Sequence, residues 1–345
     1  GPEARRVIKE EIKAAKRSIH ILTFIFSDDV VGREILALLE ERARAGVQVR
    51  ILLDSFAITW TGHPSFKKLE SLGGKVSYFM PFFHSAAAGK YNARIHRKML
   101  IIDSQVAVAG GMNIGVEYLG NQANHWRDLA LLIEGPGVED FETVFMRDWL
   151  TSCGEVLNRG PELKVSETAL CLQVIASGPD DPSNNYEATL LNALYNAKKR
   201  VWIATPYFIP DQALQTALHL ALKRGVEVVI YVPRTSNHPL ADWARGSYLR
   251  HLYDDGCVIR AVTTMMHGKA VLVDDSSAIV GSANFDMRSL HYNYEVGVLI
   301  TSKPLVAEIE QWFVSTPEKE VLSWPKPGLK RDFLESFGRL LGPLI

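Results

Sequence analysis

The chain has 345 residues, of which 47% are hydrophobic, and its formal net charge at pH 7 is −1. This length suits about two domains of ordinary size, and the composition provides enough apolar residues for two cores. A near-neutral charge disfavours a nucleic-acid enzyme, which more often carries a basic excess or stripe. The sequence has no apolar run of about 18 residues that could span a membrane and no evident signal peptide.

The sequence contains three cysteines, Cys153, Cys171 and Cys257. An odd number without metal-ligand spacing is typical of a reducing compartment, so we expect ordinary buried thiols. No group of histidine, cysteine and carboxylate residues has convincing metal-ligand spacing, and no metal is predicted.

Helices and strands are predicted to alternate along the chain. Residues 34–44 and 212–223 have the apolar spacing of helices, and each helix is expected to end at a glycine. Apolar, partly β-branched segments predict buried strands over 99–102 and 270–273. The next strands are expected at 105–109 and 277–280. This alternation is typical of the α/β class.

The two halves of the chain resemble each other over much of their length. Residues 15–19 parallel residues 197–201, and residues 44–49 parallel residues 223–228. We therefore predict two tandem homologous α/β/α domains, each with a mixed, mostly parallel sheet. The polar segment 158–167 is the expected seam. The predicted limits are 1–160 for the first domain, 168–322 for the second and 323–345 for an amphipathic tail.

One string of residues occurs twice. Each copy has a histidine, one variable residue, a lysine, four further residues and an aspartate, at His96, Lys98, Asp103 and at His267, Lys269, Asp274. Each copy then runs into a small-residue turn that ends in Asn113 or Asn284. Equivalent positions are 171 residues apart (267 − 96). Chance explains this spacing poorly, so the sequence predicts two equivalent functional segments.

Strand geometry divides the motif residues into two groups. Side chains alternate between faces, so His96 and Lys98 share a direction, whereas Asp103 and Asp274 have the opposite parity and are expected to be structural. A turn rich in glycine and serine lets the backbone approach a ligand closely. Imidazole, ammonium and carboxamide groups on adjoining strand ends predict a phosphate site.

This pattern resembles the phospholipase D superfamily, whose HxKxxxxD motifs occur in pairs and whose members act on phosphodiesters through a phosphohistidine intermediate. The resemblance covers most of the chain and implies that two domains share one active site at their interface. Several stretches narrow it to bacterial cardiolipin synthases of the phospholipase D type: residues 96–98, 110–115, 117–118, 126–128 and 205–211.

The resemblance also implies roles for the motif residues. His96 is expected to be the nucleophile and His267 the general acid and base, although a pseudo-symmetric site leaves this order open. Asp128 and Glu295 match the acidic positions that orient the histidines. Lys98, Lys269, Asn113 and Asn284 are expected to neutralise the phosphate charge. This route requires no metal and no cofactor.

Other candidates for substrate contact are less specific. Ser282 could offer a hydroxyl to the phosphate, and its counterpart in the first motif is Gly111. Tyr207 is expected either to line the substrate entrance or to be a packed aromatic residue. The apolar segment 80–83 could contact lipid. Basic residues near the first motif could hold anionic headgroups or form a solvated face: Lys67, Lys68, Lys90, Arg94 and Arg97.

The tail has helical apolar spacing, with one face formed by Leu329, Phe333, Phe337, Leu340 and Leu341. Such a helix could lie in a membrane interface or close over the core, and docking on the core is favoured slightly.

The most specific interpretation is a transphosphatidylase that forms cardiolipin from two phosphatidylglycerol molecules and releases glycerol. A phospholipase D that produces phosphatidic acid is the nearest alternative, followed by a nuclease or other phosphodiesterase and by an inactive lipid-binding scaffold. The expected partners are phosphatidylglycerol and a membrane surface, without nucleic acid. The expected location is the reducing, cytoplasmic-type side of a membrane, with a membrane anchor preceding these residues in the natural protein.

Overall fold

The computed structural model describes residues 1–79, 93–121, 125–160, 163, 170–317, 319–321, 323–324 and 327–342. The apolar segment 80–83 and Lys90 therefore lie outside the described residues. The chain divides into two compact units. The first contains residues 1–125 and 130–170, and the second contains residues 126–129 and 171–345. The domain limits expected from the sequence remain a prediction.

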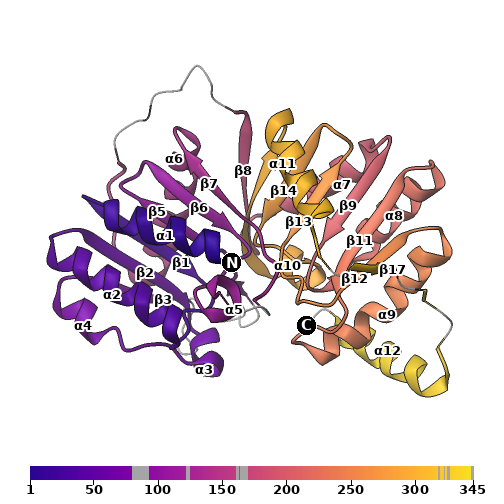
Figure 1. Cartoon of the computed structure of the whole chain (residues 1–345), viewed down its shortest axis with the longest axis horizontal. Coiled ribbons are helices and arrows are strands. Elements are labelled where there is room, and N and C mark those ends of the chain that lie inside the picture. The colour runs from indigo at the N-terminus through magenta and orange to yellow at the C-terminus, as the bar shows by residue number, and fades with distance from the viewer. Residues whose placement is uncertain are drawn as a thin grey trace. The chain divides into compact units, whose positions relative to one another are not determined.

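The first unit is built around a six-stranded mixed sheet with the strand order β3-β2-β1-β5-β6-β7 (Figure 1). Strands β1, β2 and β3 pair in parallel, whereas β1–β5, β5–β6 and β6–β7 are antiparallel. Its elements are α1 (Pro2–Ala14), β1 (Ser18–Thr23), α2 (Val30–Arg44), β2 (Gln48–Asp54), α3 (Ala57–Thr61), α4 (Lys67–Ser71), β3 (Lys75–Phe79), β4 (Arg94–Ile95), β5 (Met99–Ile102), β6 (Val106–Gly110), α5 (Val116–Leu119), β7 (Ala130–Glu134) and α6 (Gly137–Cys153).

The second unit repeats this plan with additional strands. Its main sheet runs in the order β17-β12-β11-β9-β13-β14-β16, and β8 pairs with β16. Among the described pairs of this sheet, only β9–β11 and β11–β12 are parallel. Its elements are β8 (Leu172–Ser177), α7 (Asn185–Asn196), β9 (Arg200–Ala204), β10 (Phe208–Ile209), α8 (Gln212–Lys223), β11 (Glu227–Pro233), α9 (Pro239–Asp254), β12 (Val258–Val262), β13 (Ala270–Val273), β14 (Ser277–Gly281), β15 (Phe285–Asp286), α10 (Met287–His291), β16 (Asn293–Ile300), α11 (Lys303–Val314), β17 (Lys319–Val321) and α12 (Leu329–Leu341).

The α/β class and the mixed sheets expected from the sequence are confirmed, but the sheets are not mostly parallel. Parallel strands require long crossovers, and these are supplied only where helices such as α2 and α8 connect β1 to β2 and β9 to β11. In the part of each sheet that follows the motif histidine, short hairpins join β5 to β6 and β13 to β14. Such hairpins impose antiparallel pairing.

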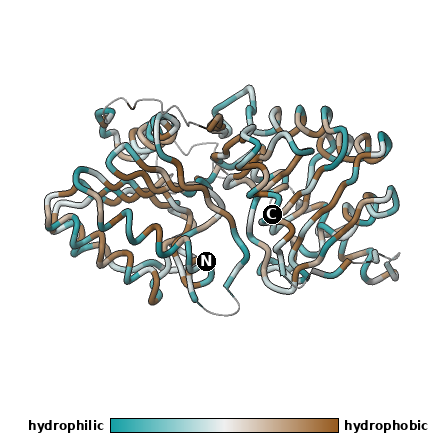
Figure 2. Tube along the Cα trace, turned by 45° about the horizontal axis from the view of Figure 1, so that its top comes forward, coloured by the Kyte–Doolittle hydropathy of each residue, from teal (hydrophilic) through white to brown (hydrophobic). Residues whose placement is uncertain are grey.

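Helices cover both faces of the sheet in the first unit. His20 of β1 stacks on Phe145 of α6 at 4.7 Å, whereas Ile21 lines a cavity with Ile8 of α1 and Ile35 of α2. Because adjacent strand residues point to opposite faces, α6 lies on one side and α1 and α2 on the other. Figure 2 shows the hydrophobic residues concentrated along the strands between these layers.

The second unit has the same layered arrangement. Its core includes Ile203 of β9, Leu194 of α7 and Leu218 of α8. On the opposite face of the sheet, Phe313 of α11 contacts Trp202 of β9 and Tyr231 of β11, with ring centroids 5.9 and 5.2 Å apart. These two layers hold β13, the strand that follows the second motif histidine.

The cysteines differ from the expectation of burial. Cys257 is buried, and burial raises the pKa of its thiol to about 12. Cys153 and Cys171 are exposed because Cys153 ends α6 and Cys171 precedes the strand β8. All three are free thiols.

Candidate active site

The second motif lies at the start of β13, in the centre of the sheet. His267 and Lys269 are 5% and 3% exposed, respectively. The Nζ atom of Lys269 donates to the carbonyl oxygen of His267 at 2.5 Å and lies 3.0 Å from each nitrogen of the His267 ring. The ammonium and imidazole groups therefore form one compact cluster, as the shared parity of these positions predicts.

Asp128 is the carboxylate partner of His267. Its Oδ2 atom lies 2.6 Å from Nδ1 of His267, and the side chain of Asp128 is fully buried. This contact fixes the Nδ1–H tautomer of a neutral imidazole, which leaves Nε2 as the acceptor. The ring of Trp126 lies 5.1 Å from that of His267, at an angle of 41°.

A short backbone ladder positions Asp128. Residues Trp126–Leu129 precede most of the second unit in sequence but belong to it in space. The N–H of Arg127 donates to Met265 at 2.8 Å, and the carbonyl of Arg127 accepts from the N–H groups of His267 and Gly268 at 2.8 and 2.9 Å. The guanidinium of Arg127 stacks over Trp312 and donates to its carbonyl at 2.6 Å. These contacts fix the backbone next to both Asp128 and His267.

Burial and charge act in opposite directions within this cluster. Burial favours the neutral form of Asp128, but the adjacent His267 and Lys269 outweigh it and hold the pKa of this carboxyl below its usual value. Burial lowers the pKa of Lys269 to about 8, although the carboxylates of Asp128, Glu295 and Asp286 oppose this shift. Lys269 therefore changes charge much closer to neutrality than an ordinary lysine.

Strand β16 contributes a second buried carboxylate, Glu295, which contacts the turn after β14. The hydroxyl of Ser282 donates to Glu295 at 2.5 Å and accepts from the N–H of Val296 at 3.0 Å. The sequence predicts that this hydroxyl could contact phosphate, and this remains a prediction; in the structure the hydroxyl holds Glu295, which is 0% exposed. Asn293 also donates to Glu295, at 3.4 Å. Ser282 thus has the geometry of a residue that positions Glu295.

The first motif repeats the same backbone arrangement in the first unit. The Nζ atom of Lys98 donates to the carbonyl oxygen of His96 at 2.5 Å, matching the Lys269 bond. The ring of Phe24 lies edge-on to His96 at 5.2 Å, and Nζ of Lys98 lies 5.6 Å from the centre of the same ring. Phe24 is a site residue that the sequence analysis missed, because its counterpart in the repeat is Pro206.

The two motif asparagines are held differently. The Oδ1 atom of Asn113 accepts from the N–H of Ile25 at 3.1 Å and lies 3.3 Å from the hydroxyl of Thr23. The backbone N–H of Asn284 donates to the hydroxyl of Ser289 at 3.1 Å, and its side-chain amide donates to the carboxylate of Asp286. Gly111 is a buried turn residue at the position equivalent to Ser282.

Asp286 was also missed by the sequence analysis. It is buried, and burial raises the pKa of its carboxyl, while its Oδ1 atom caps α10 by accepting from the N–H of Ser289 at 2.7 Å. The signal was present, because an aspartate three residues before a serine at a helix start is an N-cap pattern.

Asp103 and Asp274 bind the backbone and point away from the histidines. Asp103 accepts three N–H bonds from Lys16, Arg17 and Ser18 at 2.7–2.8 Å. Asp274 accepts equivalent bonds from Lys198, Lys199 and Arg200 at 2.7–3.3 Å. Both have positive φ angles, 54° and 53°, at the hairpin turn. This geometry gives the two aspartates a structural task at the start of β1 and β9.

Three other candidates are buried or have structural contacts. Arg97, between the motif histidine and lysine, is fully buried and forms an ion pair with Asp148 of α6. The side chain of Arg97 therefore does not reach a headgroup at the protein surface. Arg94 is also buried and is likewise kept from the surface. The hydroxyl of Tyr207 donates to Asn237 at 2.7 Å, and its ring lies 6.0 Å from that of His238.

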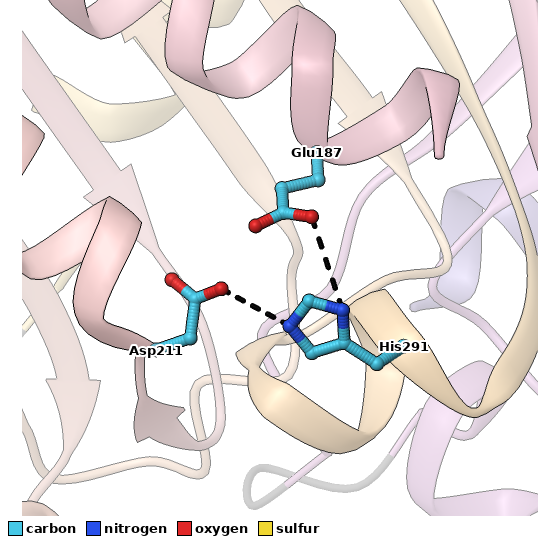
Figure 3. A group of neighbouring side chains, drawn as sticks. All are labelled: Glu187, Asp211 and His291. Atoms are coloured by element: carbon cyan, nitrogen blue, oxygen red, sulfur yellow. Dashed lines mark hydrogen bonds and ion pairs between the residues drawn. The ribbon is translucent and has the colours of Figure 1, made fainter. Parts of the chain in front are cut away.

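One cluster outside the motifs has metal-ligand chemistry. Figure 3 shows His291 between two carboxylates, with Nε2 3.0 Å from Asp211 and Nδ1 3.8 Å from Glu187. Ligand atoms of the three residues lie within 4.8 Å of one another. Asp211 also caps α8 through Leu214 at 2.9 Å, and Asn184 donates to Glu187 at 2.6 Å. The cluster thereby ties α10, directly after the second motif, to α7 and α8.

Comparisons with known proteins identify the family of the chain. The family model described as "Cardiolipin synthase, PLD-like domain" matches residues 8–149 and 190–316. Cardiolipin synthase 1 of Bacillus cereus is 35% identical over 100% of this chain and 71% of the relative. A cardiolipin synthase of Clostridium perfringens is 34% identical over 97% of this chain and 74% of the relative.

A solved structure shares the fold over the whole chain. The crystal structure of a phosphatidylserine synthase from Haemophilus influenzae has a TM-score of 0.78 at 18% identity and covers 100% of this chain and 94% of its own. Within the part of the chain that the structure describes, no helix is long and apolar enough to cross a membrane. The resemblance drawn from the twin motifs is confirmed: the chain belongs to the phospholipase D-like family of cardiolipin synthases.

Proposed function

We propose that this chain is a cardiolipin synthase that transfers the phosphatidyl group of one phosphatidylglycerol molecule to the free hydroxyl of a second. The products are cardiolipin and glycerol. Two observations support this activity: the chain carries both complete motifs, and its curated relatives are named cardiolipin synthases. The observation that carries the mechanism is the 2.6 Å contact between His267 and Asp128.

In the first half-reaction, His96 attacks phosphorus through a ring nitrogen. A P–N bond forms while the P–O bond to the glycerol headgroup breaks, and protonated His267 donates a proton to the departing oxygen. Lys98, Lys269, Asn113 and Asn284 are proposed to stabilise the charge on the phosphoryl oxygens. Asp128 holds the His267 ring through Nδ1, so that Nε2 is left for this transfer.

The second half-reaction reverses these roles. Neutral His267 removes a proton from the hydroxyl of the second phosphatidylglycerol, whose oxygen attacks phosphorus as the P–N bond breaks. His96 is released, and His267 is again protonated for the next cycle. Glu295, held by Ser282, is proposed to orient His96 as Asp128 orients His267. This pairing requires both motifs to act on one diester.

The nearest rival is hydrolysis, because water could replace the lipid hydroxyl at the same intermediate. Phosphatidylglycerol vesicles incubated with the protein and analysed by mass spectrometry distinguish the two reactions. We expect cardiolipin, reduced by added glycerol, and no product from His96→Ala or His267→Ala. Phosphatidic acid as the dominant product would instead identify a hydrolase. Cleavage of DNA, with no lipid turnover, would identify a nuclease.

The proposed substrate also implies where the enzyme works. Phosphatidylglycerol resides in bilayers, so the active protein must operate at a membrane surface. The three free cysteines are consistent with the reducing side of that membrane.

A further inference from the structure

The C-terminal helix α12 packs on the second unit through its polar side. Glu335, 3% exposed, accepts from Nη2 of Arg250 on α9 at 2.8 and 2.9 Å and from Nε of Arg331 at 2.8 Å. The sequence favoured docking of this helix on the core, with the apolar face as the natural candidate for the contact. Docking is observed, but the buried contacts use the opposite face.

Helices α12 and α9 approach each other closely at two glycines. A Cβ atom on Gly338 of α12 would lie 2.7 Å from the backbone nitrogen of Ala244, and one on Gly246 of α9 would lie 2.4 Å from the carboxylate of Glu335. At Gly338 the two helix backbones therefore approach each other directly, and at Gly246 the missing side chain leaves room for the carboxylate of Glu335, which pairs with Arg250. We name this contact of α12 with α9, formed by Glu335, Arg250, Gly338 and Gly246, the seat. The seat fixes the rotation of α12 about its own axis.

The fixed rotation directs the apolar face outward. Four large side chains on the face away from the seat are highly exposed: Leu329 93%, Phe333 70%, Phe337 45% and Leu340 77%. Their spacing of three or four residues places them in one strip. We name these four residues the apolar strip. Figure 1 shows α12 lying along α9 at the end of the chain.

An exposed strip of this kind is costly in water unless something covers it. Amphipathic helices with leucine and phenylalanine on one face and charged residues on the other bind in the interface of a bilayer. On the docked side of α12, a groove is lined by two tryptophans, Trp243 and Trp324, and by two arginines that already form ion pairs, Arg331 with Glu335 and Arg234 with Glu320. Arginine and tryptophan are side chains suited to the headgroup layer.

We propose that α12 docks the enzyme on the surface of an anionic phospholipid bilayer, with the apolar strip inserted among the acyl chains and Arg339, an exposed arginine of the same helix, at the headgroups. The proposal rests on the proposed function only for the lipid identity, because bilayer binding requires no turnover. The seat formed by Glu335 and Arg250 keeps the strip exposed while the helix stays attached to the second unit.

Vesicle flotation tests this docking directly. The whole chain is mixed with phosphatidylglycerol vesicles and, separately, with phosphatidylcholine vesicles, and the bound fraction is compared with that of Phe333→Gln/Phe337→Gln. We expect at least tenfold weaker binding of this variant to phosphatidylglycerol, with an unchanged melting temperature. A matched control, Leu150→Gln/Leu220→Gln, replaces exposed leucines on α6 and α8 and should bind as the unsubstituted chain does.

Turnover of a monomeric short-chain phosphatidylglycerol separates this proposal from the proposed function. The strip variant should keep full activity on the monomeric lipid and lose activity on vesicles. A chain inactive on every lipid but still bound to vesicles through the strip would overturn the function and leave the docking intact. The docking is overturned if the strip variant floats like the unsubstituted chain. It is also overturned if sedimentation shows a dimer that the strip substitutions dissociate without changing vesicle binding.

Discussion

Nδ1 of His267 lies 2.6 Å from Oδ2 of Asp128, although 139 residues separate them in the sequence. The contact exists because residues Trp126–Leu129 leave the first unit and pair with the strand segment that precedes His267. The second histidine therefore depends on a carboxylate contributed by the first half of the chain. This dependence leads to the first prediction.

Asp128→Asn should lower kcat for cardiolipin formation by about 100- to 10,000-fold, the range associated with losing effective acid–base catalysis. The amide no longer stabilises the imidazolium and permits the wrong tautomer. Asparagine fills the same space, so the fold should be retained, with some loss of stability at neutral pH because the stabilising charge of Asp128 is removed. Asp140→Asn on the exposed side of α6 is the control. An Asp128→Asn enzyme with normal kcat and an unchanged pH profile would contradict the orienting role.

The depressed pKa of Lys269, about 8, predicts an alkaline limit to activity. Its ammonium is charged below this pH and neutral above it, so kcat/KM should fall as the pH rises through about 8. Lys269→Arg should have lower activity but should retain it to higher pH, because the guanidinium stays protonated. A profile that falls at the same pH in both proteins would assign the limit to another group.

The buried pair of Arg97 and Asp148 predicts a large effect on stability. Arg97→Met leaves the Asp148 carboxylate buried beside an apolar side chain, which should reduce the free energy of unfolding by about 3–5 kcal/mol. The double variant Arg97→Met/Asp148→Leu removes both charges and should recover most of this loss. Urea unfolding followed by the fluorescence of the adjacent Trp149 measures both. Equal losses in the single and double variants would show that the loss does not come from the unpaired carboxylate of Asp148.

The His291 cluster predicts a pH-dependent stability. Burial, then the adjacent Asp211, raises the pKa of Glu187 to about 6 from a usual value of 4.5. The folded protein therefore binds this proton more tightly than the unfolded chain, and stability declines as the pH rises from 4.5 to 6. Glu187→Gln should be more stable than the unsubstituted protein at pH 7, by roughly 0.5–1 kcal/mol after solvent screening, with no gain at pH 4.

Glu308→Gln on the exposed surface of α11 is the matched control for this cluster. Its thermal unfolding should follow the unsubstituted protein at both pH values. A Glu187→Gln protein less stable than the unsubstituted chain at pH 7 would mean that its contact with His291 outweighs its repulsion from Asp211.

Local sequence signals predicted the motif strands and helices well. The strands over 99–102 and 270–273 and the helix over 212–223 have the expected limits, because each is an uninterrupted apolar or amphipathic segment. The second helix begins at Val30 rather than at residue 34, because the carboxylate of Asp29 caps it by accepting from Val31 and Gly32. A capping aspartate outside the periodic segment is easily missed.

Features that depend on distant contacts could not be predicted in the same way. Arginine is a residue type that commonly binds anionic headgroups, but Arg97 is paired with Asp148, 51 residues later. Serine is a residue type that can bind phosphate, and in the structure the hydroxyl of Ser282 holds Glu295. In α12 the spacing of leucine and phenylalanine identifies the apolar face correctly, yet an ion pair with Arg250 decides which face meets the protein. Residue type alone does not reveal which tertiary partner is present.

The most direct test of the account uses phosphatidylglycerol labelled with deuterium in its headgroup glycerol. Cardiolipin synthesis by transfer retains one labelled glycerol as the bridge and releases one for each molecule formed. We predict cardiolipin with a single labelled bridge and an equal amount of free labelled glycerol, both absent with His96→Ala. Labelled glycerol released together with phosphatidic acid, and no labelled cardiolipin, would contradict the central claim.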